Sequence, residues 1–385
     1  MSINLHGKIP SPIYISGRIG KVLPTFTVTF KDGDTVLQQV QVRQGGTAVY
    51  DGTVPPKDGN AFLGWVLSEP SNPIVDSDDV TVYQQISNVQ SDVTCWAVYG
   101  DKRIIHDSWA DISQYSQAGT AQNHYSVGDM KRIHIEGTVG TIAVNQDVYV
   151  YILGFDHNTS LEGSGITFGC FKDVNSLKDI CLVYSDIYSS ATDGTKMFNI
   201  NHWGYHNYGG WSVCDMRYDI LGSTDVAPSG YGTAPESSRV GYNATPTCAT
   251  SPVANTLMSC LPSDLRAVMK PITKYTDNIG GGTNVATNVT ASIDYLPLLS
   301  EYEIFDSINY VGNNTEEEKQ SQYTYYANGN SKIKYRYNDI NEAYQWWTRT
   351  PARDYNTMFC RVEDGGINSG LGGYMSRGLA PIFLV

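Results

Sequence analysis

The chain has 385 residues, of which 41% are hydrophobic and only 17% are charged. The hydrophobic share is large enough for packed cores, so the composition excludes a chain that is disordered throughout. Lys and Arg number 26 and Asp and Glu number 39, which gives a net charge of −13 and argues against nucleic acid or an anionic membrane as a partner. The 37 Gly and 27 Tyr favour strands, turns and aromatic loops. We therefore expect a soluble, β-rich α+β protein.

The sequence contains no clear targeting signal and no cysteine spacing typical of disulfides or a zinc site. No run of about 18 apolar residues is present, so we expect no membrane span. Pro10, Pro12 and Gly17 interrupt the first residues, which predicts synthesis in the cytoplasm without a signal peptide. The seven cysteines are odd in number and form no CxxC pair. This spacing predicts free thiols in a reducing compartment and disfavours a zinc site.

Residues 1–24 are short, rich in Gly and Pro, and alternate Ile13, Ile15 and Ile19 with polar neighbours. Two interpretations stay open for this segment. It is either an arm that attaches the chain to another protein or an N-terminal edge strand.

Residues 25–100 predict a small, independent β domain. Period-2 alternation marks strands at Phe26–Phe30 and at VLQQVQV, where Val36, Val40 and Val42 are spaced for one face. Pro and Gly turns precede Trp65, and the segments VTVYQQI and VTCWAVY complete the unit.

The same segment resembles the internalin-type β-grasp repeat of bacterial surface proteins. The resemblance is carried by TVTF at 27–30, the pair Gly64-Trp65, Val80-Thr81 and WAVY at 96–99. It implies a spacer or adhesion module without chemistry of its own. Trp65 and Trp96 are expected to be core residues.

Residues 101–385 predict a second, larger domain with several elements. A short helix begins after Ser108 as N-cap, with Trp109 and Ile112 facing inward, and a strand enters at Lys131. A hairpin follows, in which Val148, Val150 and Ile152 alternate with Tyr149 and Tyr151. Next comes a helix with Ser263 as its cap and Pro271 as its end. Residues 283–305 return to strand and turn.

The last forty residues contain a candidate binding surface. Trp346, Trp347, Pro351 and the apolar strand 380–385 are expected to be framework. Mixed Tyr, Asn, Arg, Ser and Asp side chains on Gly-rich loops resemble the composition of antibody paratopes. The alternative is a long, turn-rich hairpin with solvated polar side chains. The candidate ligand-binding residues are Arg353, Asp354, Tyr355, Asn356, Arg361, Glu363, Asp364, Ile367, Asn368, Ser369, Leu371, Tyr374, Met375 and Arg377.

Residues 108–385 resemble an uncharacterised domain family common in gut bacterial and prophage proteins. The shared phrases, in order, are WADIS, YSVGD, YILGFDHN, GGW with MR, LPSDLRAVMKP, LLSEYEIF, WWTRTP and GLAPIFLV. The closing stretch is also similar to the C-terminal module of C-type-lectin-like phage proteins that are diversified by retroelements. These resemblances imply a C-type-lectin-like domain with long loops, whose surface side chains vary around a fixed framework.

No complete catalytic or metal-binding motif is present. His202 and His206 are spaced i, i+4, but Trp203 stands where a zinc protease needs its glutamate. Glu301 and Glu303 are expected on one face of a strand, where a solvated or hydrogen-bonded role is favoured over glycoside hydrolysis. The triplets of calcium-dependent lectins and the cysteine pair of formylglycine-generating enzymes are also missing, since Cys360 stands alone in its region. We expect no enzyme activity, no cofactor and no metal.

A second aromatic run lies at Gly204–Val213. It predicts either part of a binding wall or core packing, and core packing is favoured for Trp211.

Together these features predict a virion protein of a phage that binds a receptor on the host bacterium, either a protein or a glycan. The arm would join it to other virion proteins, and a homo-oligomer is expected. Its symmetry stays open, and the resemblance implies a trimer only as one option, because three-fold symmetry is common among such parts. It would be made in the host cytoplasm and would not insert into a membrane. Two alternatives stay open: a structural decoration or head-fibre protein of the virion, and a glycan hydrolase.

Overall fold

The computed structural model describes residues 23–184, 197–201, 207, 209–225, 246–277, 285–307, 320–352 and 355–385, without the side chain of Cys170. Nearly all of the predicted N-terminal arm, residues 1–22, lies outside the described residues. The chain divides into two compact units, the first ending at Lys102 and the second beginning at Arg103. Each is described by itself.

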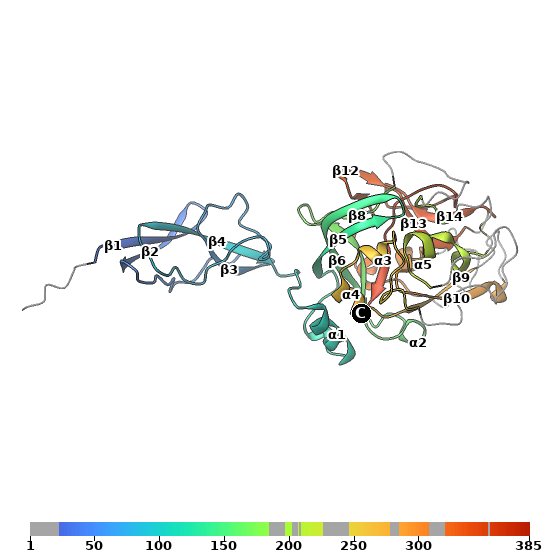
Figure 1. Ribbon diagram of the computed structural model, residues 1–385, viewed down its shortest axis with the longest axis horizontal. Coiled ribbons are helices and arrows are strands. Elements are labelled where there is room, and N and C mark those ends of the chain that lie inside the picture. The colour runs from blue at the N-terminus through green and yellow to red at the C-terminus, as the bar shows by residue number, and fades with distance from the viewer. Residues whose placement is uncertain are drawn as a thin grey trace, which may run out of the picture. The chain divides into compact units, whose positions relative to one another are not determined.

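The first unit is a four-stranded sheet in the order β2-β1-β4-β3 (Figure 1). Its strands are β1 (Thr25–Asp32), β2 (Thr35–Arg43), β3 (Asn60–Val66) and β4 (Val93–Asp101). The central pair β1 and β4 is parallel, while β2 and β3 pair antiparallel to them. One face of the sheet buries Val28, Phe30, Trp65, Cys95 and Tyr99, because side chains two residues apart share a face.

Two strand predictions and one predicted core residue, Trp96, need correction in the first unit. Val36 is 51% exposed, because a bulge between Phe30 and Lys31 shifts the register and brings Leu37 against the core instead. The segment VTVYQQI forms isolated bridges at Tyr83 and Ile86 rather than a strand. Of the two predicted core tryptophans, Trp65 is confirmed at 1% exposure.

Trp96 is half-buried on the other face of the sheet. It alternates along β4 with the core residues Cys95 and Ala97, so the pleat directs it away from the core. Lys31 Nζ lies 6.0 Å from its ring centroid.

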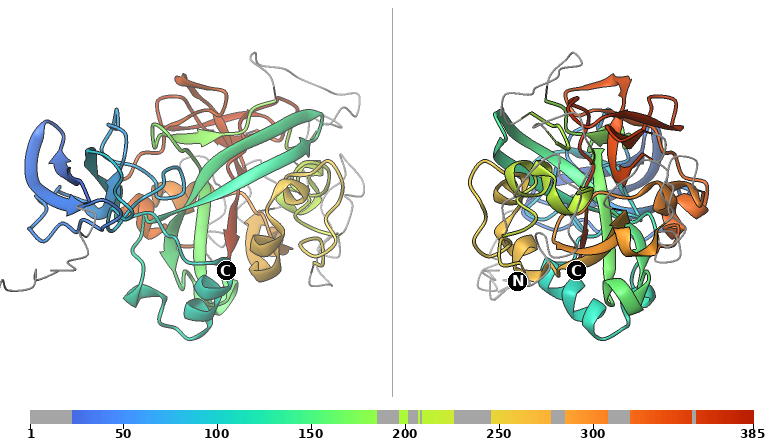
Figure 2. Two further views of the ribbon diagram at one scale, coloured as in Figure 1. Left: turned by 60° about the vertical axis from the view of Figure 1, so that its left-hand side comes forward. Right: turned by 90° about the vertical axis from the view of Figure 1, so that its right-hand side faces the viewer.

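The second unit is organised around a seven-stranded sheet. Along the order β12-β11-β8-β7-β6-β5, with β16 added beside β7, its strands are β12 (Asp339–Tyr344), β11 (Lys334–Arg336), β8 (Asp179–Cys181), β7 (Ile166–Asp173), β6 (Ile142–Phe155), β5 (Met130–Val139) and β16 (Ile382–Leu384). The predicted hairpin is confirmed as β5 and β6, which run across the unit as the two long green strands in Figure 2.

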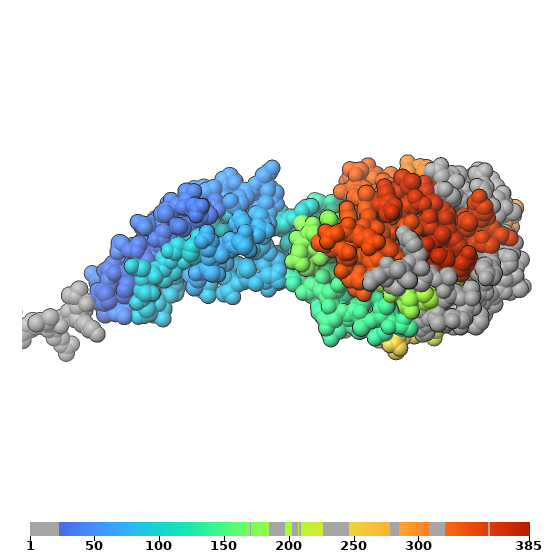
Figure 3. Space-filling view, turned by 90° about the horizontal axis from the view of Figure 1, so that it is seen from above, coloured from blue at the N-terminus to red at the C-terminus, as the bar shows by residue number. Residues whose placement is uncertain are grey.

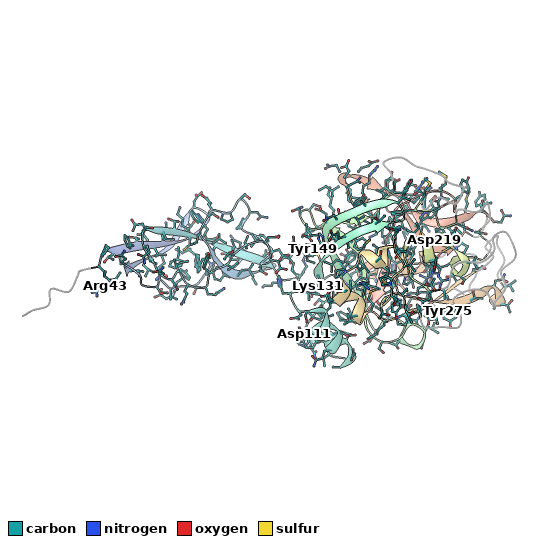
Figure 4. All side chains as sticks on the ribbon, in the orientation of Figure 1. Arg43, Asp111, Lys131, Tyr149, Asp219 and Tyr275 are labelled. Carbon is teal, nitrogen blue, oxygen red and sulfur yellow. The ribbon has the colours of Figure 1, made fainter. Side chains whose placement is uncertain are left out.

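Residues 148–154 of β6 are buried on both faces, whereas the half of the hairpin nearer its turn exposes one face, with His134 and Glu136 of β5 in solvent. Val148, Val150 and Ile152 face one hydrophobic cluster, whereas Tyr149 and Tyr151 face another. Figure 4 marks Tyr149 on β6 and Lys131 on the paired strand β5. In the second half of β6 the alternation therefore does not separate a core face from a solvent face.

Short helices and two smaller sheets complete the second unit. The helices are α1 (Trp109–Gln117), α2 (Thr159–Glu162), α3 (Leu257–Cys260), α4 (Ser263–Val268), α5 (Glu301–Phe305) and α7 (Thr324–Ala327). One smaller sheet pairs β9 (Ile272–Asp277) with β10 (Val289–Asp294). The other joins β13 (Trp346–Pro351), β14 (Met358–Val362) and β15 (Asn368–Gly372).

The helix predictions are confirmed for α1 and corrected elsewhere. The Ser108 side chain accepts a hydrogen bond from Asp111 N, and Trp109 and Ile112 are buried. At α4 the N-cap is Pro262 and Ser263 is already helical. The predicted strand at Glu301 and Glu303 is wrong, because these residues form α5. A capping box at Ser300 starts that helix by pairing its hydroxyl with Glu303 N.

Six cysteine side chains are described, and all are buried and free, as predicted: Cys95, Cys181, Cys214, Cys248, Cys260 and Cys360. Burial raises the pKa of Cys95 to about 12. Within the described parts of the chain, no helix is both long enough and apolar enough to cross a bilayer.

Candidate binding surface

The candidate residues lie on and around the sheet of β13, β14 and β15. Both strand pairs are antiparallel, so the β13–β14 loop and the segment after β15 meet at one end of β14. The β14–β15 turn lies at the other end. Since β14 has five residues, the two ends are about 17 Å apart at a rise of about 3.3 Å per residue. The sheet therefore brings the candidate residues together in two groups.

The register of β14 and β15 assigns their side chains to two faces. Arg361 pairs with Ser369, and Phe359 pairs with Leu371, so these four share one face with each other. The alternate residues, including Cys360 and Asn368, face the opposite side.

Asn207 holds the β13–β14 loop in place by hydrogen bonds. Its side-chain amide donates to the carbonyl oxygens of Tyr355 and Met358, at 3.0 and 2.9 Å. Its backbone N–H donates to Asn356 O at 2.7 Å. Asn207 is completely buried, so these bonds hold the loop backbone while the Tyr355 side chain stays 53% exposed.

The segment after β15 is fastened by the same stretch of chain. Asn201 N donates to Gly373 O at 3.1 Å, and the Asn199 side chain donates to Tyr374 O. Arg377 is buried, with its N–H bonded to Phe198 O. Its guanidinium Nε donates to Gln345 Oε1 at 3.1 Å. Arg377 thus supports the surface from within.

A tight turn closes the other end of the sheet. Glu363 N donates to Ile367 O at 2.8 Å and Gly366 N to Glu363 O at 2.9 Å. Gly366 has a φ of +77°, and a Cβ there would approach Ile333 Cγ1 to 3.0 Å. Glycine is therefore required by both backbone conformation and packing. The turn presents Ile367, which is 60% exposed.

An ion pair lies beside Ile367 on the face of the sheet that carries Ser369. Arg361 donates from Nη2 to Glu363 Oε1 at 2.9 Å. Hydrogen bonds from Arg361 and Ser369 lower the pKa of Glu363, so the carboxylate is charged at neutral pH. These polar groups are already oriented before any ligand arrives.

The structure thus separates the candidate residues by accessibility. Tyr355, Asn356, Asp364 and Ile367 are exposed. Seven are half-buried: Arg361, Glu363, Asn368, Ser369, Leu371, Tyr374 and Met375. Leu371 and Met375 pack against the main core. Arg353 and Asp354 lie outside the described residues. In the space-filling view, the orange and red C-terminal segments of the second unit gather on one face (Figure 3).

Asn368 points to the opposite face and contacts a buried carboxylate. Its side-chain amide donates to Glu301 Oε1, and Thr350 Oγ1 accepts from Glu301 N at 3.1 Å. Glu301 is completely buried. Asn368 therefore links the sheet to α5, a role that composition did not reveal.

Glu303, the other predicted carboxylate, lies in a buried ion cluster under β13. Its carboxylate accepts from Arg349 Nη1 at 2.5 Å and Nη2 at 3.1 Å. It also lies 2.7 Å from Lys274 Nζ, which is 2.8 Å from Glu162. Burial opposes ionisation, but the charges of Arg349 and Lys274 outweigh it and lower the pKa of Glu303. Both predicted carboxylates are thus inaccessible, and they form no acid–base pair around a bound sugar.

Other predicted sites have different outcomes. The histidine pair His202 and His206 lies outside the described residues, as do most of the aromatic residues in the second run. Trp211 is confirmed as core: it is completely buried and donates from Nε1 to Asp294 Oδ2 at 2.9 Å. Asn207 was missed, because no local pattern around this asparagine indicates that its side chain holds a distant loop by hydrogen bonds.

Residues 250–385 are similar to a family described as a domain of unknown function (DUF6273). The matched stretch runs from before α3 to the end of the chain and includes the whole candidate surface. No curated protein matches the chain. No solved structure matches it either.

Proposed function

We propose that the second unit is a binding domain that recognises a surface ligand through the loops around β14 and β15. One observation carries the proposal. Of the three large hydrophobic side chains exposed in the described part of this unit, two are Tyr355 and Ile367. Exposed apolar side chains amid polar groups are typical of recognition sites.

The support beneath these side chains favours binding over a solvated hairpin. A loop that only connects strands needs no buried residue to hold it. Asn207 nevertheless donates hydrogen bonds to three backbone oxygens of the loop around Tyr355. Pre-ordered loops lose less conformational entropy when a ligand binds. Tyr355 and Ile367 stand at opposite ends of a five-residue strand, a spacing of about 17 Å. This span suits an extended epitope of a protein or an oligosaccharide rather than a small metabolite.

The whole chain then acts as a receptor-binding or adhesin protein of a phage virion, and the ligand is a protein or glycan on the host bacterium. The resemblance of residues 108–385 to prophage and retroelement-diversified proteins supports this role. The mixed sheet of the first unit, with its parallel central pair, suits the β-grasp-like spacer that the sequence predicts. The N-terminal arm would join other virion proteins.

The test is binding of the purified, labelled chain to a panel of candidate host bacteria. We compare the wild type with Tyr355→Ser combined with Ile367→Ser, and with Val285→Ser as the matched control. Val285 is also an exposed hydrophobic residue of this unit, at 47%, but it lies outside the candidate surface. Thermal melting of all three proteins checks that folding is intact.

We expect saturable binding that the control retains and the double variant loses by at least tenfold in affinity, which corresponds to about 1.4 kcal/mol. Equal binding by the double variant and the wild type would refute the placement of the site. If the wild type binds no host in the panel, the receptor-binding role fails and the structural virion role takes its place.

A further inference from the structure

The two edges of the first unit's sheet differ in how their backbone groups are satisfied. At the β3 edge, Trp65 N donates to Tyr83 O at 2.9 Å and Tyr83 N donates to Trp65 O at 2.8 Å. The segment around Tyr83 therefore covers this edge. At the β2 edge, within the described residues, the backbone hydrogen bonds of residues 35–42 all go to β1, and only the last residue, Arg43, also bonds elsewhere, through its carbonyl oxygen to Gly46 N in the turn that follows. Half of the donors and acceptors of β2 thus face outward.

β2 also lacks most of the features that prevent an edge strand from pairing with a strand of another chain. Lysine, proline and inward charges usually protect such edges, but TVLQQVQV, residues 35–42, contains none of these. The only irregularity is the bulge at Leu37. Gln39 and Gln41 donate to the hydroxyls of Thr29 and Thr27, at 3.3 and 2.8 Å, so their side chains are held against the sheet and leave the edge clear.

Only another extended strand matches an outward row of alternating N–H and C=O groups. A second copy of β2 fits this edge in particular. The chain carries −13, so two copies repel at most surfaces, yet residues 35–42 are uncharged and do not repel each other. In the antiparallel register centred on Gln39, each Gln39 lies opposite Gln39 of the other copy.

We propose that β2 is a docking edge for β2 of a second copy of this chain, so that two first units form one continuous sheet about a two-fold axis. Such an edge contact buries less than the roughly 1,200 Å² of a stable interface. The dimer is therefore weak and forms in the micromolar range. The docking edge does not depend on the binding role proposed for the second unit. If that role holds, pairing presents two binding surfaces together and raises avidity.

The test is sedimentation velocity of the full chain from about 1 to 300 μM, a range that spans the expected weak affinity. One variant carries Gln39→Lys and Gln41→Lys, and a second carries Gln39→Glu and Gln41→Glu. Like charges placed opposite each other across two strands are destabilising, and opposite charges are stabilising. The control Gln85→Lys adds a charge at an exposed residue away from β2.

We expect a concentration-dependent dimer of the wild type and of the control. Each double variant alone should dimerise at least tenfold more weakly, and an equimolar mixture of the two should dimerise as well as the wild type or better. A monomeric wild type over the whole range would overturn the proposal, as would dimerisation that both double variants retain. Thermal melting of each variant checks that a lost dimer is not a lost fold.

Discussion

The side chains on the two faces of the sheet formed by β13, β14 and β15 have different roles. On one face Arg361, Glu363 and Ser369 form a half-buried polar group beside the exposed Ile367. On the other face Asn368 contacts the buried Glu301. The comparison teaches that polar residues in one short hairpin divide between recognition and support, and that the register of the strands decides which residue has which role.

The largest expected effect comes from the supporting side. Glu303→Gln removes the carboxylate that pairs with Arg349 and Lys274 and leaves buried positive charge uncompensated. Breaking a buried pair costs about 3–5 kcal/mol. We expect a loss of that size in the free energy of unfolding, measured by urea denaturation. A loss below about 1 kcal/mol, the typical value for a surface ion pair, would show that the cluster does not stabilise the fold.

Acid should reveal the same cluster. Because the folded pKa of Glu303 lies below its ordinary value of 4.5, its contribution is complete at neutral pH and is lost as the pH falls through 4.5 toward the folded pKa. We expect the wild type to lose more stability between pH 7 and pH 3 than Glu303→Gln loses, as measured by urea denaturation at several pH values. Parallel pH profiles of the two proteins would contradict this assignment.

Asn207→Ala is expected to have an intermediate effect. It removes the amide donor shared by Tyr355 O and Met358 O. Each oxygen keeps one backbone donor, Met358 N and Ala352 N respectively, so the expected loss is about 0.5–1.5 kcal/mol for each hydrogen bond removed. Hydrogen exchange should show faster exchange around residues 355–358, while β5 and β6 keep their protection. Unchanged exchange in this loop would mean that Asn207 does not hold it.

The smallest effect on stability is expected on the accessible side. Tyr355→Ser and Ile367→Ser remove side chains that are more than half exposed, and such surface changes usually stay within about 0.5 kcal/mol. Urea denaturation should therefore give the wild-type free energy of unfolding for both. A loss above 1 kcal/mol would move these residues from the recognition group to the supporting group.

The sequence predicts elements well where alternation is regular and burial is one-sided. In β1 the alternate residues Val28 and Phe30 share one core, and their pattern was sufficient. In β4 it was not, because Trp96, which was predicted as core, lies on the other face and is half-buried. The pattern also failed at Val36, because a bulge shifts the register without any local signal. It failed again at Glu301 and Glu303, because a helix of five residues is too short to show its period.

The residue types of the candidate surface could be predicted from the sequence, but the directions in which their side chains point could not. Tyr355 and Ile367, named as candidate ligand-binding residues, are exposed, and their binding role stays a prediction. Arg377 and Asn368 belong to the same mixed composition, yet the fold directs the first into the interior and the second to Glu301. Their orientation depends on strand register and on partners distant in sequence, such as Gln345, and no local pattern encodes these.

The most direct test of the account compares affinity and melting temperature in two variants side by side. One is Tyr355→Ser with Ile367→Ser, and the other is Asn207→Ala, each assayed on a host that binds the wild type. We predict that the double variant loses at least tenfold in affinity without a change in melting temperature, whereas Asn207→Ala lowers both. If the double variant keeps its affinity, or loses it only together with its melting temperature, the separation of recognition from support is wrong.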